Sequence, residues 1–275
     1  MSDYDPAAFD AFEEAGWGTK EAAGYDALAG RVTARLADPL LDAVGAGPGT
    51  RVIDIATGPG YVAARAAERG ADPVGLDFSE TMLAFARSRS PGVELVHGNA
   101  TALPFPDGSF DAATCAFLLL HVARPETVVA EAARVLAVDG RAAFSVWNEP
   151  SRSRWLGVIL EAFAATGAPS PPDVPPGPPI FRFADESEFS RLLTNAGLAD
   201  VAVKTVEFPL ELESVDELWN GLVAGTVRLR PLVVGQSPEV IHAIRTNFDE
   251  LLEEYRAERG FDVPVSVKIA SGRKP

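Results

Sequence analysis

The sequence predicts an α/β protein built on a doubly wound sheet of seven strands. From residue 51 to residue 147, short apolar runs alternate with alanine-rich stretches of helical periodicity, and glycine or proline follows most of them. This alternation is typical of βαβ units, in which parallel strands are covered by helices. Two further alternating runs towards residue 275 bring the expected number of strands to seven.

The first half of the chain gives most of these elements. Residues 1–45 are expected to be helical, and the glycine-rich stretch 45–49 ends them. Strands are expected at 51–56, 73–77, 93–97, 110–117 and 141–147. Helices are expected at 61–69 with a glycine C-cap, at 79–89 with Ser79 as N-cap, and at 126–138, closed by Asp139-Gly140.

The second half is less regular. A helix is expected at 152–166, and the seven prolines of 168–179 exclude a helix or a central strand there. A capping box at Asp185–Glu188 opens a helix that ends at Gly197. A strand at 201–212, helices at 214–228 and 237–259 and a strand at 263–270 complete the chain. We expect one domain with three parts: a helical cap (1–45), a binding core (46–150) and a completion of the sheet with inserted helices (151–275).

Composition limits the class of protein. The single cysteine, Cys115, excludes a disulfide framework, and three dispersed histidines make a zinc site improbable. No apolar run is long enough to span a bilayer, the first residues are acidic, and a cytoplasmic location is expected. The net charge of −15 repels phosphate backbones, which argues against a nucleic-acid partner, and it keeps the protein soluble. A homo-oligomer is left open.

The strongest local signal is the segment Asp54–Gly60, which leaves a strand and enters a helix. Its glycines let the backbone approach a ligand, and the helix N–H groups can hold a phosphate or a carboxylate. Asp54 would repel a pyrophosphate but suits an ammonium group. Asp77 ends the second strand and can accept hydrogen bonds from a ribose diol, or it caps the helix that follows.

Three motifs resemble the class I S-adenosylmethionine-dependent methyltransferases, in particular the ubiquinone and menaquinone C-methyltransferase branch, which includes many natural-product enzymes. They are residues 52–60 (VIDIATGPG), residues 74–83 (VGLDFSETML) and residues 98–111 (GNATALPFPDGSFD). The resemblance is strong from 51 to 147. It implies a Rossmann-like fold whose last strand is antiparallel, inserted helices over the pocket, and S-adenosylmethionine as cosubstrate.

The resemblance also implies roles for individual residues. The amino-acid end of the cosubstrate would lie on the loop, the ribose on Asp77, the adenine face near Phe78 and Met82, and the adenine edge at Asn99 and Ala100. Phe117 would lie beside the cosubstrate, and the loop residues are Ala56, Thr57, Gly58 and Gly60. The family usually has glycine at Ala56 and aspartate at Asn99. We expect the Asn99 oxygen to accept the bond from the adenine amino group that aspartate would accept.

Methyl transfer needs an acceptor held in line with the donor and, for some acceptors, a base. His121, just after the fourth strand, is the candidate base, with a structural histidine as the equal alternative. Trp147 and Asn148 could form the floor of the acceptor site, although a core role suits Trp147 better. Trp17 and Tyr25 could stack on the acceptor or pack on the sheet.

Three functions follow from these patterns. The first is methyl transfer to a small acceptor that is aromatic, quinone-like or another natural-product intermediate. The second is a nicotinamide-dependent oxidoreductase, for which no Tyr-x-x-x-Lys pattern is found at the expected site. The third is a non-catalytic protein that binds S-adenosylmethionine. His97, within a strand, is expected to be a core residue. The proline stretch is expected to be a linker, with a lid over the acceptor or a polyproline ligand for another protein as alternatives.

Overall fold

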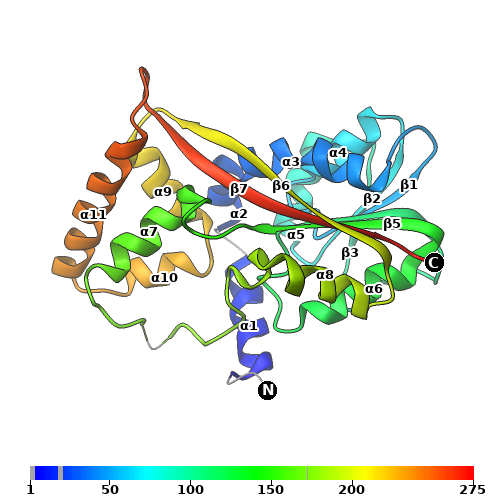
Figure 1. Cartoon of the computed structure of the whole chain (residues 1–275), viewed down its shortest axis with the longest axis horizontal. Coiled ribbons are helices and arrows are strands. Elements are labelled where there is room, and N and C mark those ends of the chain that lie inside the picture. The colour runs from blue at the N-terminus through cyan, green and yellow to red at the C-terminus, as the bar shows by residue number, and fades with distance from the viewer. Residues whose placement is uncertain (1–3, 18–20, 172) are drawn as a thin grey trace. The chain divides into compact units, whose positions relative to one another are not determined.

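The computed structural model describes residues 4–17, 21–171 and 173–275 (Figure 1). Its seven strands form one sheet in the order β3-β2-β1-β4-β5-β7-β6, in which β7 is antiparallel. The strands are β1 (Arg51–Ile55), β2 (Asp72–Asp77), β3 (Glu94–His97), β4 (Phe110–Ala116), β5 (Leu136–Trp147), β6 (Ala199–Leu212) and β7 (Phe261–Arg273). The predicted fold class is therefore confirmed.

The chain forms two compact units, and each is described by itself. The nucleotide-fold unit comprises residues 33–146, 178–206 and 268–275. The helical unit comprises the described residues of 1–32, 147–177 and 207–267.

In the nucleotide-fold unit, β1 lies between β2 and β4 and runs parallel to both. Ile53 is in register with Val74 on one side and with Ala113 on the other. β2 pairs with all five residues of β1, and β4 pairs with Val52 to Ile55, which suits a short and mostly apolar strand. The helices of this unit are α3 (Ala29–Val44, shared with the helical unit), α4 (Tyr61–Glu68), α5 (Glu80–Arg89), α6 (Pro125–Val135) and α8 (Glu186–Asn195).

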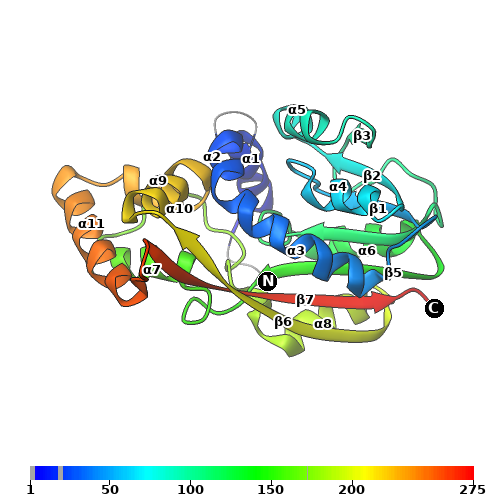
Figure 2. The same ribbon diagram turned by 90° about the horizontal axis from the view of Figure 1, so that it is seen from above.

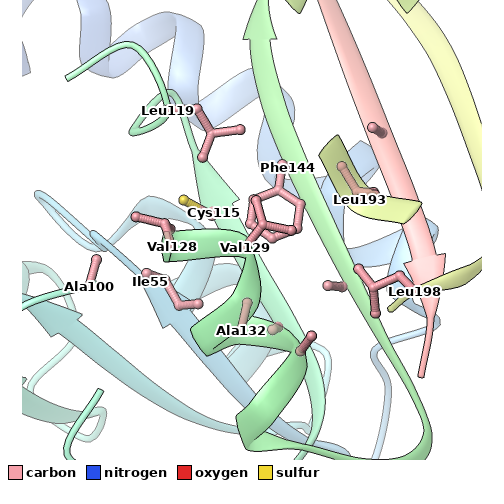
Figure 3. Packing of buried hydrophobic residues seen from close by; sticks show 14 of the residues in the cluster. Ile55, Ala100, Cys115, Leu119, Val128, Val129, Ala132, Phe144, Leu193 and Leu198 are labelled. Atoms are coloured by element: carbon pink, nitrogen blue, oxygen red, sulfur yellow. The ribbon is translucent and has the colours of Figure 1, made fainter. Parts of the chain in front are cut away.

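The main core lies between the sheet and two of these helices. Figure 3 shows Val128, Val129 and Ala132 of α6 packing against Cys115 and other apolar residues of the sheet. Leu193 of α8 and Leu198 extend the same cluster (Figure 3). Figures 1 and 2 show α3 and α4 on the opposite face of the sheet, so both faces are covered. This arrangement leaves the carboxyl ends of β1, β2 and β4 as the place where a ligand binds in such sheets.

The helical unit contains α1 (Pro6–Trp17), α2 (Glu21–Ala27), α7 (Arg154–Ala164), α9 (Val215–Gly225), α10 (Leu229–Val234) and α11 (Pro238–Leu252). Gly24 and Gly225 let the backbones of α2 and α9 meet, because a Cβ atom on Gly225 would lie 2.7 Å from the carbonyl carbon of Gly24. Asn247 of α11 donates to the carbonyl of Ala162 in α7 at 3.2 Å. Apolar contacts and a few such bonds thus hold these helices to one another.

Several expected boundaries are wrong, and the strand expected to begin at residue 141 begins at Leu136. The helix expected to end at residue 138 ends at Val135, because Gly108 N–H and the Lys274 ammonium bond the carbonyl of Arg134 and the chain continues directly into β5. The helix expected at 214–228 ends at Gly225, and α10 follows as a separate short helix. The last expected helix ends at Leu252 and is followed by a 3-10 turn, Glu253–Tyr255.

Candidate functional site

The loop between β1 and α4 has the unusual backbone that its sequence predicts. Ala56, Gly58 and Gly60 all have positive φ, at 55°, 53° and 82°. Gly60 is the N-cap of α4, and no side chain caps this helix in the part of the chain that the structure describes. A Cβ atom on Gly60 would lie 2.9 Å from Cβ of Ala86, so only glycine fits there. The loop therefore passes close to α5 and presents main-chain groups in place of side chains.

The buried side chain of Asp54 anchors this loop through hydrogen bonds. Its side chain is buried, and the residue is 1% exposed. The hydroxyl of Thr57 donates to Oδ2 at 2.6 Å, the hydroxyl of Thr114 donates to Oδ1 at 2.9 Å, and the N–H of Ala63 donates to Oδ2 at 3.2 Å. Donors from the loop, from α4 and from β4 thus meet on one carboxylate.

The side chain of Asp77, at the end of β2, also binds the loop. The N–H of Gly58 donates to its Oδ2 at 2.8 Å, and the N–H of Ser79 donates to its Oδ1 at 2.9 Å. Ser79, and not Asp77, caps α5, because the Ser79 hydroxyl accepts from the N–H of Met82. A carboxylate has about four acceptor positions, so these bonds leave capacity for a ligand hydroxyl.

The two carboxyl groups share an unusual electrostatic state. Burial, with a smaller contribution from the negative charge of Asp77, raises the pKa of Asp54 to about 6, against the hydrogen bonds from Thr57 and Thr114. Burial likewise raises the pKa of Asp77 to about 6, although backbone N–H groups and His97 oppose the shift. Ionising both of these neighbouring buried acids costs free energy. A ligand that carries a positive charge lowers this cost, so the pair favours such a ligand.

Two residues of this region were missed by the sequence analysis. Thr114 bonds Asp54 from the neighbouring strand, and Arg89 donates to the carbonyl of Pro59 at 2.6 Å. The Arg89 guanidinium also lies 3.9 Å from the centre of the Tyr61 ring. Thr114 could have been found as a polar residue in the middle of a buried strand, whereas a basic residue in the last turn of a helix carries no such signal.

Phe117 follows β4 and adopts the same rare backbone as Ala56. Its φ is 57°, its side chain is buried, and its N–H donates to the carbonyl of Ser145 at 3.1 Å. β1 and β4 are neighbours, so two strained non-glycine residues lie at the carboxyl ends of adjacent central strands. Such strain clusters at ligand sites. His121 lies in the following turn, where its N–H donates to the carbonyl of Leu118 at 2.7 Å.

The segment after β3 carries the residues expected near adenine. Asn99 is exposed and Ala100 is buried, and the main chain of Asn99 pairs with that of Ala102. Phe78 is half-buried and Met82 is buried, both beside the end of β2. The structure thus brings these residues, the loop, Asp77 and Phe117 to the carboxyl ends of neighbouring strands.

His97 was expected to be a core residue, and that expectation is wrong. It is exposed at the end of β3, and its Nε2 lies 2.7 Å from the carbonyl oxygen of Phe78. β3 is short and lies at the edge of the sheet, so its last residue is not covered. The imidazole instead ties the end of β3 to the turn after β2.

The four expected acceptor contacts lie in the helical unit. The rings of Trp17 and Tyr25 meet edge to face at 5.4 Å, and Trp17 donates to Glu13 at 3.1 Å. Trp147 is buried against the Trp155 ring at 5.0 Å. Asn148 is 2% exposed and donates to the Ser266 hydroxyl at 2.9 Å, so its described bonds give it a structural role. Contact of these four residues with an acceptor stays a prediction.

Replacement of Ala56 by glycine is expected to stabilise the protein. A positive φ costs an L-residue about 1–2 kcal/mol, and glycine removes that cost, so the free energy of unfolding should rise by about 1 kcal/mol. Thermal unfolding followed by circular dichroism measures it. Ala67→Gly, on the exposed side of α4, is the control and should destabilise by about 1 kcal/mol. A loss of stability in Ala56→Gly would contradict the strain at this residue.

Comparison with known proteins agrees with this geometry. A family model described as "Methyltransferase domain" matches residues 53–144. The demethylmenaquinone methyltransferase of Renibacterium salmoninarum is 33% identical over 189 residues, which are 66% of this chain and 80% of that protein. The demethylmenaquinone methyltransferase of Paenarthrobacter aurescens is 31% identical over 189 residues, 66% of this chain and 75% of that protein.

Solved structures are similar in fold. The YcgJ protein of Bacillus subtilis superimposes with a TM-score of 0.58 at 20% identity, over 87% of this chain and 98% of that one. The sheet order and the antiparallel β7 define the Rossmann-like methyltransferase class. With the relatives above, they place the chain plainly: it belongs to the class I S-adenosylmethionine-dependent methyltransferases. It is an enzyme of that family, and S-adenosylmethionine is its methyl donor.

The residues of the site fit this donor. Its amino-acid part carries an ammonium, and the loop lies beside two acids of raised pKa, while the N–H groups of Thr57, Gly58 and Gly60 are bonded within the chain. Within the described ranges, no helix is long and apolar enough to cross a membrane. The same residues contain no group of three or more His, Cys, Asp or Glu side chains that could hold a metal ion.

Proposed function

We propose that this methyltransferase acts on a small aromatic or quinone-like acceptor, or on a natural-product intermediate of similar chemistry. The observation that carries the proposal is the name of its relatives, demethylmenaquinone methyltransferase, at 31–33% identity over 189 residues. The net charge of −15 supports an acceptor without phosphate chains. A cytoplasmic location is part of the same proposal and is supported by the single, buried cysteine.

The roles proposed for the site follow from its geometry. The methyl donor supplies a methyl group on a sulfonium, which is already an activated leaving group. Thr57, Gly58 and Gly60 present main-chain groups to its amino-acid end, and Asp77 accepts from its ribose. Phe78, Met82 and Ala100 form the apolar surroundings of the base. Support comes from their common place at the carboxyl ends of β1, β2 and β3.

The acceptor side of the proposal rests on aromatic residues. Trp17 and Tyr25 already meet edge to face, and a flat acceptor could replace or extend such a pair. Trp147 and Asn148 are kept as acceptor contacts only as a prediction, because both are buried and bonded within the helical unit. Replacing Trp17 or Tyr25 should therefore affect the KM for the acceptor more than the affinity for the donor.

The proposal is tested by incubating the full chain with S-adenosylmethionine and a panel of acceptors that includes demethylmenaquinone, simple hydroquinones and phenols. Mass spectrometry should find one added methyl group on at least one quinone or phenol. Calorimetry with S-adenosylhomocysteine and with NADH serves as the cosubstrate control, and only the first should bind. Binding of S-adenosylhomocysteine without any methyl transfer would favour a non-catalytic protein and would contradict the proposed acceptors.

His121 is proposed as the general base, and its replacement by alanine is expected to lower kcat by about 100-fold or more for an acceptor that must lose a proton. Affinity for S-adenosylhomocysteine should stay unchanged, because His121 follows Phe117 in the turn after β4 and is not part of the loop. His242→Ala, on the exposed side of α11, is the matched control. An unchanged kcat in His121→Ala would leave this histidine with a structural role only.

Affinity for S-adenosylhomocysteine is expected to rise with pH. Asp54 and Asp77 have pKa values of about 6, so both ionise between about pH 5 and pH 7, and the α-ammonium of the ligand stays charged there. We expect an increase in affinity of roughly tenfold over this range. The same raised pKa values make the stability of the folded protein depend on pH. The contribution of the two acids to stability is fully present below about pH 4 and is lost as pH rises through about 6.

Calorimetry in two buffers of different ionisation enthalpy measures the proton release that accompanies this binding. At about pH 6, binding should release protons because the ligand favours the ionised acids. Proton uptake, or an affinity that falls with pH, would show that the ligand does not bring positive charge to these two groups.

A further inference from the structure

Arg89, in the last turn of α5, bonds the main chain of the loop between β1 and α4. Its Nη1 donates to the carbonyl of Pro59 at 2.6 Å, and its Nη2 donates to the hydroxyl of Tyr61 at 3.1 Å. The guanidinium carbon also lies 3.9 Å from the centre of the Tyr61 ring. One side chain of α5 therefore contacts the residues on both sides of Gly60.

The face of α5 that carries Arg89 packs against this loop. Ala86 is 1% exposed and comes three residues before Arg89, so the two side chains lie on the same face of the helix. Gly60 passes so close to this face that a Cβ atom on it would lie 2.9 Å from Cβ of Ala86. The packing of its own helix thus places Arg89 at the loop.

The peptide between Pro59 and Gly60 is the part of the loop that Arg89 holds. Rotation of this peptide changes ψ of Pro59 and φ of Gly60. The proline ring fixes φ and not ψ, and Gly60, at a φ of 82°, accepts either sign of φ. The N–H of Gly60 donates to the carbonyl of Thr57 at 2.9 Å, and Arg89 bonds the carbonyl of the same peptide. Because the C=O and N–H of a trans peptide point in opposite directions, the two bonds hold its plane from both sides.

We propose that Arg89 is a positioning residue for the methyl donor: it holds the Pro59–Gly60 peptide in the orientation in which the loop receives the amino-acid end of S-adenosylmethionine. The inference rests on the proposed placement of that end on the loop. A flipped peptide would break the bond between Gly60 and Thr57 and turn the Pro59 carbonyl away from α5, which changes the surface that the loop presents to the ligand. A guanidinium suits this task because its rigid fork of N–H groups reaches two acceptors at once.

Two ligands separate this role from a general effect on the fold. S-adenosylhomocysteine carries the amino-acid part, and 5′-methylthioadenosine has the same nucleoside and sulfur without it. In calorimetry on the full chain, Arg89→Met should weaken binding of S-adenosylhomocysteine about tenfold, the scale of one hydrogen bond from a charged donor. Binding of 5′-methylthioadenosine should change by less than about twofold, because this ligand does not reach the loop.

The conservative variant Arg89→Lys should restore most of the affinity. Its ammonium keeps the charge and can donate to the Pro59 carbonyl, but it lacks the fork that also reaches Tyr61, so a loss of about threefold is expected. This loss should again be confined to S-adenosylhomocysteine. Circular dichroism checks that both variants are folded, and Arg89→Lys carries the comparison of the two ligands if Arg89→Met does not fold.

Arg87→Met is the matched control. Arg87 lies two residues earlier in α5, its side chain is exposed, and it pairs with Glu80 at 3.5 Å, so the same charge is removed from the same helix. Its affinities for both ligands should equal those of the wild-type protein. If the Arg89 variants lose affinity for both ligands equally, or for neither, Arg89 serves only the fold of α5: the inference is wrong and the proposed function stands. If the wild-type protein binds the two ligands equally well, the placement of the amino-acid end on the loop fails, and the inference fails with it.

Discussion

Replacement of Asp77 by alanine is expected to weaken binding of S-adenosylhomocysteine by about 100-fold, because two hydrogen bonds from the ribose to a carboxylate are lost. The change also removes the acceptor for the N–H of Gly58, so the loop loses one of its anchors. Both effects act in the same direction, so the expected loss of affinity is large. Calorimetry measures it directly.

Asp72→Ala provides the control for this change. Asp72 is exposed at the opposite end of the same strand, so its replacement removes one acid from the same element without touching the site. Its affinity for S-adenosylhomocysteine should match that of the wild-type protein. A wild-type affinity in Asp77→Ala would mean that the ribose lies elsewhere and that Asp77 serves only the loop and the turn before α5.

Replacement of Asp54 by alanine should affect both folding and binding. Three donors, the hydroxyls of Thr57 and Thr114 and the N–H of Ala63, lose their common acceptor inside the protein. A buried donor without a partner costs about 1–3 kcal/mol, and relief of the buried charge offsets part of that cost, so we expect a loss of about 2 kcal/mol in stability. Binding of S-adenosylhomocysteine should become undetectable because the loop is no longer held.

Asp54→Asn separates the two effects. An asparagine oxygen can accept from Thr57 and Ala63 while its amide nitrogen donates to the Thr114 hydroxyl, so all three partners stay bonded. We expect stability close to that of the wild-type protein and an affinity reduced by about tenfold, since only the charge is lost. If Asp54→Asn binds as well as the wild type, the charge of Asp54 plays no part in binding.

The course of the chain through the central strands was predictable because local signals and tertiary contacts agree there. The strands at residues 51, 73 and 110 are largely apolar and buried, as central parallel strands usually are, and Ser79 caps α5 as expected. The end of α6 was missed because Lys274, far away in the sequence, bonds the carbonyls of Arg134 and Leu136. The sequence around residue 138 gives no sign of this long-range contact.

The residue types of the candidate site could be named from the sequence, but their hydrogen bonds within the chain could not. The loop, Asp54 and Asp77 follow from their place at strand ends. That both oxygens of each acid are already bonded within the chain could not be seen, since Thr114 reaches Asp54 from another strand. The orientation of the Asn99 amide depends on the hydrogen-bond geometry of Thr101, which sequence spacing does not specify.

The strained backbone of Phe117 has a consequence for protein engineering. A library screened for heat resistance alone would enrich glycine or asparagine at this position, because either residue accepts a φ of 57° more easily than phenylalanine does. Each gain would remove a large ring from the end of β4, next to the place proposed for the methyl donor. Selection for thermal stability is thus expected to favour glycine or asparagine at residue 117, whereas selection for catalytic turnover is expected to retain phenylalanine.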